Sequence, residues 1–209
     1  MAELLAACEA DFAGYDEVYD LVYNETPKYG NDDEYADSLL RAVAASLQAV
    51  IAGRPTPKGS KTVVEFLPTT CHVYFGQVME ASPNGRHKGI PLPDGISPEK
   101  GGDRNGPTAV IKSASKIDQT KTGGALLNQK FTPSVVAGEA GITHMAALVR
   151  SYFALDGHHI QFNVIDRETL VKAQQNPQDY ENLIVRVAGY SDYFNNLEKA
   201  LQDEIIFRT

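Results

Sequence analysis

The sequence has few of the features that mark secreted, membrane-bound or metal-binding chains. Its two cysteines, Cys8 and Cys71, are too few and too far apart for a disulfide framework or a zinc site. No apolar run approaches the ~18 residues of a transmembrane helix, and the N-terminus lacks the basic-then-apolar pattern of a signal peptide. We therefore expect a cytoplasmic protein with no membrane contact and no metal site.

Positive charge is also scarce, because 19 Lys and Arg residues face 27 Asp and Glu residues, for a net charge of -8. The negative charge is spread along the chain, which argues against nucleic acid as a partner. The adjacent His158 and His159 would point to opposite sides of a strand and cannot chelate one ion. With 43% hydrophobic and 22% charged residues, the 209-residue chain can bury a sizeable core.

Two helices are expected first. Residues 1–26 carry apolar side chains at three- and four-residue steps, and Gly14 is a weak point where this helix can break. Residues 31–33 offer N-caps for a second helix, which has the cleanest helical period in the sequence. The two apolar stripes are Leu4, Leu5, Cys8, Phe12, Tyr15, Tyr19 and Val22, and Leu39, Leu40, Val43, Leu47, Val50 and Ile51.

Strands are expected from residue 63 onward. Residues 63–67 and 72–76 are short β-rich runs, and residues 123–131 read as a glycine turn followed by a buried strand. The strand at 158–164 alternates apolar residues with the polar residues 159, 161 and 163. A polar barrel lumen and a solvent-facing edge strand both produce this pattern, so periodicity leaves the two alternatives open.

Helices are expected between these strands, at 108–116, 139–154 and 167–175. Residues 81–107 are rich in glycine and proline but keep apolar residues among the turns, which predicts an ordered structural loop rather than a domain boundary. The tetrad Ser113 to Lys116 matches a Ser-x-x-Lys acyl-transfer pattern. It lacks the partner motifs of such enzymes, so we expect a plain helix there.

Near the C-terminus, a strand at 183–187 runs into the lone Gly189 and then into a polar, aromatic turn. A final helix follows, with Asn195 as the expected N-cap and Glu198 at its third position. A glycine that only supplies a positive φ in a turn would explain Gly189 equally well.

The stretch Arg186-Val187-Ala188-Gly189-Tyr190-Ser191 nevertheless resembles the radical loop of the glycyl radical enzymes, the superfamily of pyruvate formate-lyase. The resemblance favours the branch of glycerol, choline and hydroxyproline dehydratases and lyases, although it does not fix a substrate. Further motifs occur in the family's order, namely Asn84-Gly85-Arg86, Asp94-Gly95-Ile96-Ser97-Pro98, Gly106-Pro107-Thr108-Ala109, Leu126-Leu127-Asn128-Gln129-Lys130-Phe131 and Gly157-His158-His159-Ile160-Gln161-Phe162-Asn163-Val164.

In that family the glycine matching Gly189 loses an α-hydrogen and stores an unpaired electron. The chemistry needs glycine because the α-carbon must flatten, and a β-carbon would then clash with the neighbouring peptide groups. The resemblance implies a radical loop around this residue. The other residues of this loop would be Arg186, Val187, Ala188, Tyr190 and Ser191.

The resemblance also implies the fold: α/β, the C-terminal portion of a ten-stranded β/α barrel of the glycyl radical enzyme type, with the radical loop region at the C-terminus. Residues 1–80 would be a helical segment and a late barrel strand of the large catalytic domain. Residues 81–209 would be the C-terminal glycine radical domain region. Leu67 and Thr69 are the candidates for lining a substrate.

The implied chemistry uses no bound cofactor. A separate radical-SAM activating enzyme, with S-adenosylmethionine and a [4Fe-4S] cluster, would install the glycyl radical. The radical would then oxidise a cysteine, and that thiyl would attack a small-molecule substrate. The full-length enzyme, oxygen-sensitive and anaerobic, is expected to be a homo-oligomer.

The family places the thiyl cysteine in a Gly-Cys-Val-Glu loop, and this sequence has no such loop, so Cys71 is not that residue. We therefore expect the C-terminal fragment of a dehydratase, a C–C, C–O or C–N lyase, or a formate acetyltransferase. Its missing N-terminal half would supply the cysteine. A stand-alone radical donor that complements a partner and an inactive truncated remnant are the alternatives.

Overall fold

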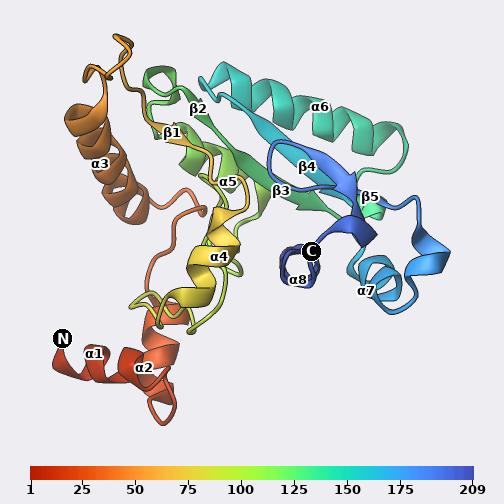
Figure 1. The fold of residues 1–209 in the computed structure, drawn as a ribbon, viewed down its shortest axis with the longest axis horizontal. Helices are drawn as coiled ribbons and strands as arrows, with labels where there is room; N and C mark the ends of the chain where they lie inside the picture. Colours follow the sequence, from red (N-terminus) through yellow and green to blue (C-terminus); the bar gives the residue numbers. More distant parts are fainter. The chain divides into compact units, whose positions relative to one another are not determined.

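The computed structural model describes residues 1–209, apart from the side chain of Arg208, and has mixed α/β content (Figure 1). The helices are α1 (Ala2–Glu9), α2 (Asp16–Asp20), α3 (Glu34–Ile51), α4 (Cys71–Val78), α5 (Gly106–Ser115), α6 (Gly138–Ala154), α7 (Arg167–Gln175) and α8 (Lys199–Arg208). The strands are β1 (Glu65–Phe66), β2 (Gly124–Ala125), β3 (Leu127–Phe131), β4 (Ile160–Val164), β5 (Ile184–Arg186) and β6 (Ser191–Tyr193).

The chain divides into two compact units. The first comprises Met1–Pro27 and Thr70–Leu92, and the second comprises Lys28–Thr69 and Pro93–Thr209. One division point falls within the irregular segment 81–107, which we had expected to contain no boundary. The assignment of residues 1–80 and 81–209 to two parts of a larger enzyme is a different kind of division and stays a prediction.

In the first unit, the N-terminal helix breaks earlier than Gly14. Helix α1 ends at Glu9, and Asp11 and Phe12 both take positive φ values, of 50° and 62°. The reversal lets Phe12 join Ala7 and Val22 in a small buried cluster. Leu5, expected on the apolar stripe, is 53% exposed and lies outside that cluster.

Also in the first unit, the strand expected at 72–76 is wrong, because these residues lie in helix α4. His72, Val73 and Gly76 are buried, which is a helical spacing rather than an alternating one. Gly76 allows the helix to approach the backbone of residues 90–91, since a Cβ there would lie 2.5 Å from the carbonyl oxygen of Ile90. Short apolar runs fit a buried helix or a strand equally well, and the close contact decides for the helix.

In the second unit, helix α3 begins where the sequence predicts. The side chain of Asp33 accepts a hydrogen bond from the backbone N–H of Ala36 at 3.1 Å, which is an N-cap. The apolar stripe is not the buried side, however. The buried residues are Asp37 and Ala44, whereas most of the stripe is exposed, including Leu39 at 56% and Val43 at 58%.

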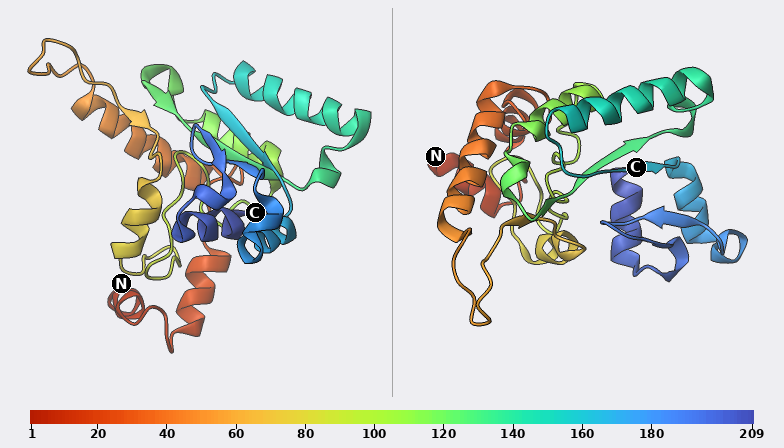
Figure 2. Two further views of the ribbon diagram at one scale, coloured as in Figure 1. Left: turned by 45° about the vertical axis from the view of Figure 1, so that its right-hand side comes forward. Right: turned by 90° about the horizontal axis from the view of Figure 1, so that it is seen from above.

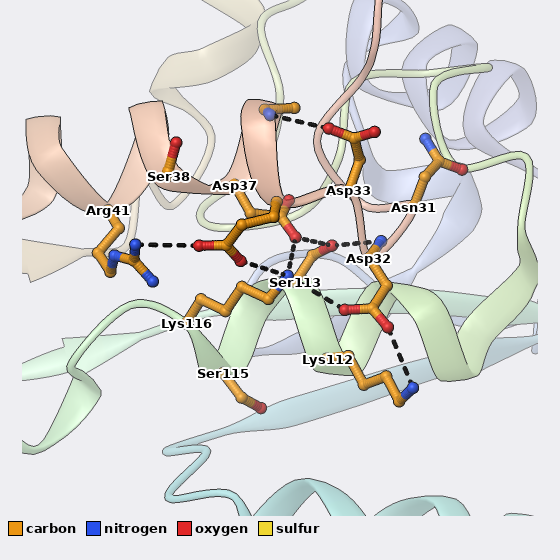
Figure 3. Close-up of polar contacts among 12 residues, drawn as sticks. Asn31, Asp32, Asp33, Asp37, Ser38, Arg41, Lys112, Ser113, Ser115 and Lys116 are labelled. Carbon is orange, nitrogen blue, oxygen red and sulfur yellow. Dashed lines mark hydrogen bonds and ion pairs between the residues drawn. The ribbon is translucent and has the colours of Figure 1, made fainter.

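A charged network ties the start of α3 to α5 (Figure 3). Lys116 Nζ lies 2.8 Å from Asp37 Oδ2 and 3.1 Å from Asp32 Oδ1, and Ser113 Oγ donates to Asp37 Oδ2 at 2.9 Å. Although burial opposes the ammonium charge, the hydrogen bonds that Lys116 donates to Asp37, Asp32 and Glu34 raise the pKa of its side chain. Hydrogen bonds from Lys112 and Lys116 lower the pKa of Asp32.

Parallel strands β3 and β4 form the central pair of the second unit, in the register Leu127↔Ile160 to Phe131↔Val164. One face of the pair packs against α5 and α6, with Leu127, Ile111 and Tyr152 in the core. Figure 2 (right) shows α6 on one side of these strands, and α7, α8 and the β5–β6 hairpin on the other. The strand expected at 63–67 shortens to β1, which pairs with β2 in parallel.

The start of β4 is fixed by the end of α6. Gly157 closes the helix by donating its N–H to the Tyr152 carbonyl at 3.0 Å, and a Cβ at Gly157 would lie 2.5 Å from the Tyr152 ring. Tyr152 is completely buried, and burial raises the pKa of its phenol to about 12. Ile142 and Phe153 of α6 are exposed, at 67% and 49%.

The C-terminal elements match the predicted order with one correction. Helix α7 spans the expected residues and is capped by Asp166, whose carboxylate accepts from the Thr169 N–H at 2.8 Å. Asn195 does not cap α8, because residues 194–196 form a 3-10 turn and its side chain donates to the Pro177 carbonyl at 2.7 Å instead. Glu198 occupies the N-cap position. Leu201 and Ile205 of α8 are buried, and so is Leu197 just before the helix.

Candidate functional site

The C-terminal hairpin presents Gly189 at its tip. Strands β5 and β6 are antiparallel, with Ile184 opposite Tyr193 and Arg186 opposite Ser191. The N–H of Val187 donates to the carbonyl of Tyr190 at 2.8 Å, so Ala188 and Gly189 form the turn. Gly189 takes a φ of +78°, which glycine adopts readily and residues with a side chain disfavour.

The surroundings of Gly189 are open. A Cβ built on this residue would meet no atom within 4 Å, and Gly189 is exposed. Steric crowding therefore does not explain the glycine, but its positive φ does. The conformation of the turn is therefore enough to explain a glycine at this position. The backbone geometry alone gives no evidence for or against a chemical role of Gly189.

Gln161 on strand β4 holds the turn from one side. Its Oε1 accepts the N–H of Gly189 at 3.0 Å, and its Nε2 donates to the carbonyl of Val187 at 3.0 Å. The side chain is 5% exposed. Because a buried amide must satisfy both its donor and its acceptor, this arrangement fixes the orientation of Gln161 and of the turn together.

Arg186 holds the other side of Gly189. Its Nη2 donates to the Gly189 carbonyl at 3.1 Å, its Nη1 donates to Ser191 Oγ at 3.3 Å, and its Nε donates to Gln161 Oε1 at 3.2 Å. Both the N–H and the carbonyl of Gly189 are thus hydrogen-bonded by side chains. The arginine contacts join the two sides of the turn.

Asn163 completes the polar face of β4. Its Nδ2 donates to the Arg186 carbonyl at 2.9 Å, and its Oδ1 accepts the Arg186 N–H at 3.0 Å. The polar face of the strand is therefore buried against the hairpin, and the solvent-facing alternative is wrong. Gln161 and Asn163 were not recognised as site residues from the sequence, although the alternation at 159, 161 and 163 was the signal.

His159 is the third polar residue of this face. Burial, followed by the charges of Arg186 and His158, lowers the pKa of His159. Its Nδ1 is buried without a hydrogen-bond partner among the described residues. The imidazole is neutral near neutral pH and keeps the face of β4 free of a second positive charge.

The remaining predicted site residues fall into two places. Val187 and Ala188 are buried, whereas Tyr190 and Ser191 are exposed at the hairpin tip, and burial of part of its ring raises the pKa of the Tyr190 phenol. Leu67 and Thr69 lie after β1 and are both exposed, Thr69 with a φ of 56°. Their role as substrate-lining residues stays a prediction.

In the part of the chain that the structure describes, we find no metal site, no free Ser-x-x-Lys serine and no membrane-spanning helix. No group of three or more His, Cys, Asp and Glu side chains is arranged to hold a metal ion. The hydroxyl of Ser113 is buried and already bonded to Asp37, so the Ser-x-x-Lys tetrad belongs to the charged network. Among the described helices, none is long and apolar enough to cross a membrane.

Comparison with protein families agrees with the hairpin geometry. Residues 92–195, which include Gly189 and both strands of the hairpin, match the family model described as "Glycine radical". Residues 1–76 match the model described as "Pyruvate formate lyase-like". Together the two matches cover most of the chain. The chain belongs to the glycyl radical enzyme family. Membership implies a radical carried by the protein itself.

Dehydratases and lyases of this family are similar over the whole chain. The chain is 61% identical over 209 residues to the trans-4-hydroxy-L-proline dehydratase of Clostridioides difficile, covering 100% of this chain and 26% of that protein. It is 43% identical over 212 residues to the isethionate sulfite-lyase of Bilophila wadsworthia, covering 100% of this chain and 25% of that protein.

Solved structures of glycyl radical enzymes are similar as well. Hydroxyproline dehydratase from Clostridioides difficile, with trans-4-hydroxy-L-proline bound, superposes with a TM-score of 0.96 at 62% identity, covering 99% of this chain and 26% of that one. The glycerol-bound B12-independent glycerol dehydratase from Clostridium butyricum superposes with a TM-score of 0.95 at 43% identity, covering 100% of this chain and 26% of that one. The chain spans about a quarter of the length of these relatives.

Proposed function

We propose that Gly189 stores the radical of a glycyl radical dehydratase or lyase, of which this chain is the C-terminal part. One observation carries the proposal: the segment matching the glycine radical model contains a hairpin whose tip is Gly189, with both its N–H and its carbonyl held by side chains. Arg186, Val187, Ala188, Tyr190 and Ser191 form the radical loop around it.

The radical is installed by a separate activating enzyme that uses S-adenosylmethionine and a [4Fe-4S] cluster to remove an α-hydrogen from Gly189. The glycyl radical then takes the hydrogen of a cysteine thiol outside this chain, and that thiyl attacks the substrate. Arg186 and Gln161 hold the turn in place for these transfers. Residues around the hairpin exclude water and oxygen once the rest of the enzyme covers Gly189.

The wider architecture follows the family. Strands β1 to β4 belong to a ten-stranded β/α barrel, and the hairpin reaches toward its centre. The polar face of β4 and the parallel pairing of β3 with β4 support this arrangement. Residues 1–80 belong to the large catalytic domain and residues 81–209 to the glycine radical domain region. Leu67 and Thr69 line the substrate site, and the full enzyme is a cytoplasmic homo-oligomer.

The reaction is a dehydration. Identity of 61% to a hydroxyproline dehydratase, against 43% to a sulfite-lyase, favours removal of a hydroxyl group from a small substrate over C–C or C–S cleavage. The thiyl would take a hydrogen atom from the substrate, the substrate radical would lose water by cleavage of its C–O bond, and the cysteine thiol would return a hydrogen atom to the product radical, which regenerates the thiyl.

The test is electron paramagnetic resonance of the full-length protein after anaerobic incubation with a matching activating enzyme. We expect a glycyl doublet that disappears in Gly189→Ala. Gly53→Ala is the matched control, because Gly53 has the same φ of +78° and equally open surroundings. A doublet retained in Gly189→Ala, or none in the wild type, would overturn the proposal. A doublet on the 209-residue chain alone would favour a stand-alone radical donor.

A further inference from the structure

We propose that Gln161 and Arg186 are positioning residues for the Gly189 radical, and that Gln161 sets its lifetime and its distribution of spin. This inference rests on the proposed function, because it assumes that Gly189 carries the radical. It adds a role for a strand residue that lies well outside the loop motif in the sequence.

The two residues hold the two peptide groups that flank the α-carbon. The peptide group before Gly189 presents its N–H to Gln161 Oε1 at 3.0 Å, and the carbonyl after it accepts from Arg186 Nη2 at 3.1 Å. Arg186 Nε also donates to Gln161 Oε1 at 3.2 Å, so the two side chains act as one unit.

The orientation of these peptide groups matters for an α-carbon radical. Its unpaired electron spreads onto the neighbouring nitrogen and carbonyl to an extent that depends on the angles between the peptide groups and the flattened carbon. Glycine restricts these angles less than any other residue. Fixed hydrogen bonds from neighbouring side chains must therefore supply the restriction that the residue itself lacks.

The burial of Gln161 and the charge of Arg186 strengthen their hydrogen bonds to the peptide groups around Gly189. Gln161 is 5% exposed, so water does not compete for its hydrogen bonds. The carbonyl oxygen that receives spin also gains electron density, and the Arg186 guanidinium donates a charge-assisted hydrogen bond to that oxygen. Both contacts favour the delocalised radical over a localised one.

Asn163 provides an internal control. It lies on the same face of β4, is also buried, and bonds the N–H and carbonyl of Arg186 at 3.0 Å and 2.9 Å. In the described structure its hydrogen bonds anchor the hairpin through Arg186 and do not reach Gly189. If Gln161 served only to dock the hairpin, substitutions at the two positions would have the same consequence.

The experiment compares Gln161→Met and Asn163→Leu in the full-length protein, activated anaerobically and with glycine labelled by ¹⁵N. We expect Gln161→Met to broaden the doublet, to shift the nitrogen hyperfine coupling of Gly189, and to shorten the anaerobic lifetime of the radical about fivefold, the equivalent of one net hydrogen bond. Asn163→Leu should keep the wild-type line shape and coupling.

An unchanged coupling and lifetime in Gln161→Met, or equal changes in both variants, would overturn the inference. If Gln161→Met does not accept a radical, Gln161→Glu provides the test, because it keeps the oxygen that accepts the Gly189 N–H. We expect Gln161→Glu to restore the wild-type nitrogen coupling, and a shifted coupling there would also overturn the inference. Absence of a Gly189-dependent doublet in the wild type is a separate result, which would contradict the proposed function itself.

Discussion

Gly189 meets two separate requirements with one residue. Its φ of +78° in the hairpin turn favours glycine on conformational grounds alone, and Gly53 shows the same angle with no proposed chemistry. The proposed radical requires glycine for a different reason, namely that the α-carbon must flatten. The first requirement is visible in the backbone, whereas the second is supported by the family match over residues 92–195.

Oxygen should reveal the position of the radical. If Gly189 carries it, exposure of the activated full-length protein to air should cut the chain at this residue, because oxygen adds to the α-carbon radical. Mass spectrometry should find a C-terminal piece that starts at Gly189 or immediately after it. Unactivated protein and activated Gly189→Ala should stay intact. Cleavage at any other glycine would contradict the assignment.

His159 should make the stability of the chain depend on pH. Its folded-state pKa lies below the usual 6.5, so the unfolded state binds the proton more tightly. The stabilising contribution is therefore fully present above pH 6.5 and is lost as the pH falls from 6.5 toward the folded pKa. Denaturant unfolding of the full-length protein at pH 7.5 and 5.5 should show this loss, and His159→Gln should reduce it. An equal loss in both proteins would contradict the prediction.

At the scale of elements, the network between α3 and α5 is expected to stabilise the second unit. Lys116→Met would leave the carboxylate of Asp37 buried without its cation, since Asp37 is completely buried and Lys116 only 22% exposed. The expected loss is about 3 kcal/mol in the free energy of unfolding. Chemical denaturation of the full-length protein measures it.

Lys112→Met is the matched control for this prediction. Lys112 pairs with Asp32 at 3.0 Å, but its side chain is 54% exposed. Exposed ion pairs contribute less than about 1 kcal/mol. Equal losses in Lys112→Met and Lys116→Met would show that burial of Asp37 does not make its pairing essential.

The sequence predicted some elements well because their signals are local. Helix α7 was predicted at its observed bounds, since Asp166 supplies a cap and Pro177 follows its end. Helix α4 was mistaken for a strand, because what decides its conformation is the close approach of Gly76 to residues 90–91, and a sequence pattern does not show that contact. Asn195 failed as a cap for the same reason, since its partners lie on residues 177 and 180.

The candidate site shows the same division between local and distant signals. The hairpin glycine and Arg186 follow from one contiguous motif, and the structure brings them together by hydrogen bonds. Gln161 lies 28 residues from Gly189 in sequence, and its contact depends on the packing of β4 against the hairpin. The alternating pattern of β4 indicated a polar face but could not show what that face would meet.

For the whole molecule, the exposed stripe of α3 agrees with a chain that spans about a quarter of its relatives. We expect the rest of the enzyme to cover this stripe. Val43→Asn should therefore lower the free energy of unfolding of the full-length protein by about 2 kcal/mol. Ala45→Asn, on an exposed side of the same helix outside the stripe, should cost only the lower helix propensity of asparagine, less than about 0.7 kcal/mol, a loss that Val43→Asn does not incur because valine and asparagine have similar propensities.

Comparing Val43→Asn with Ala45→Asn shows whether the stripe on α3 is covered in the full-length protein. An effect of Val43→Asn no larger than that of Ala45→Asn, measured by chemical denaturation of the full-length protein, would show that the stripe stays in solvent. A large effect at Val43 alone would show that residues outside this chain pack against α3. The 209-residue chain by itself, where Val43 is 58% exposed, should lose less than about 1 kcal/mol on either substitution.

In the described part of the chain, the hairpin is attached to strand β4 by side chains and not by a backbone ladder. Strand β4 pairs with β3 and β5 pairs with β6, and among the described residues no backbone ladder joins β4 to the hairpin. The connection runs through the side-chain amides of Gln161 and Asn163. Separating two strands of a ladder breaks a cooperative series of backbone bonds, whereas undocking this hairpin would break side-chain hydrogen bonds of Gln161 and Asn163 and expose the buried Val185 and Val187. The contacts that dock the hairpin on β4 are therefore the same contacts that hold the turn around Gly189.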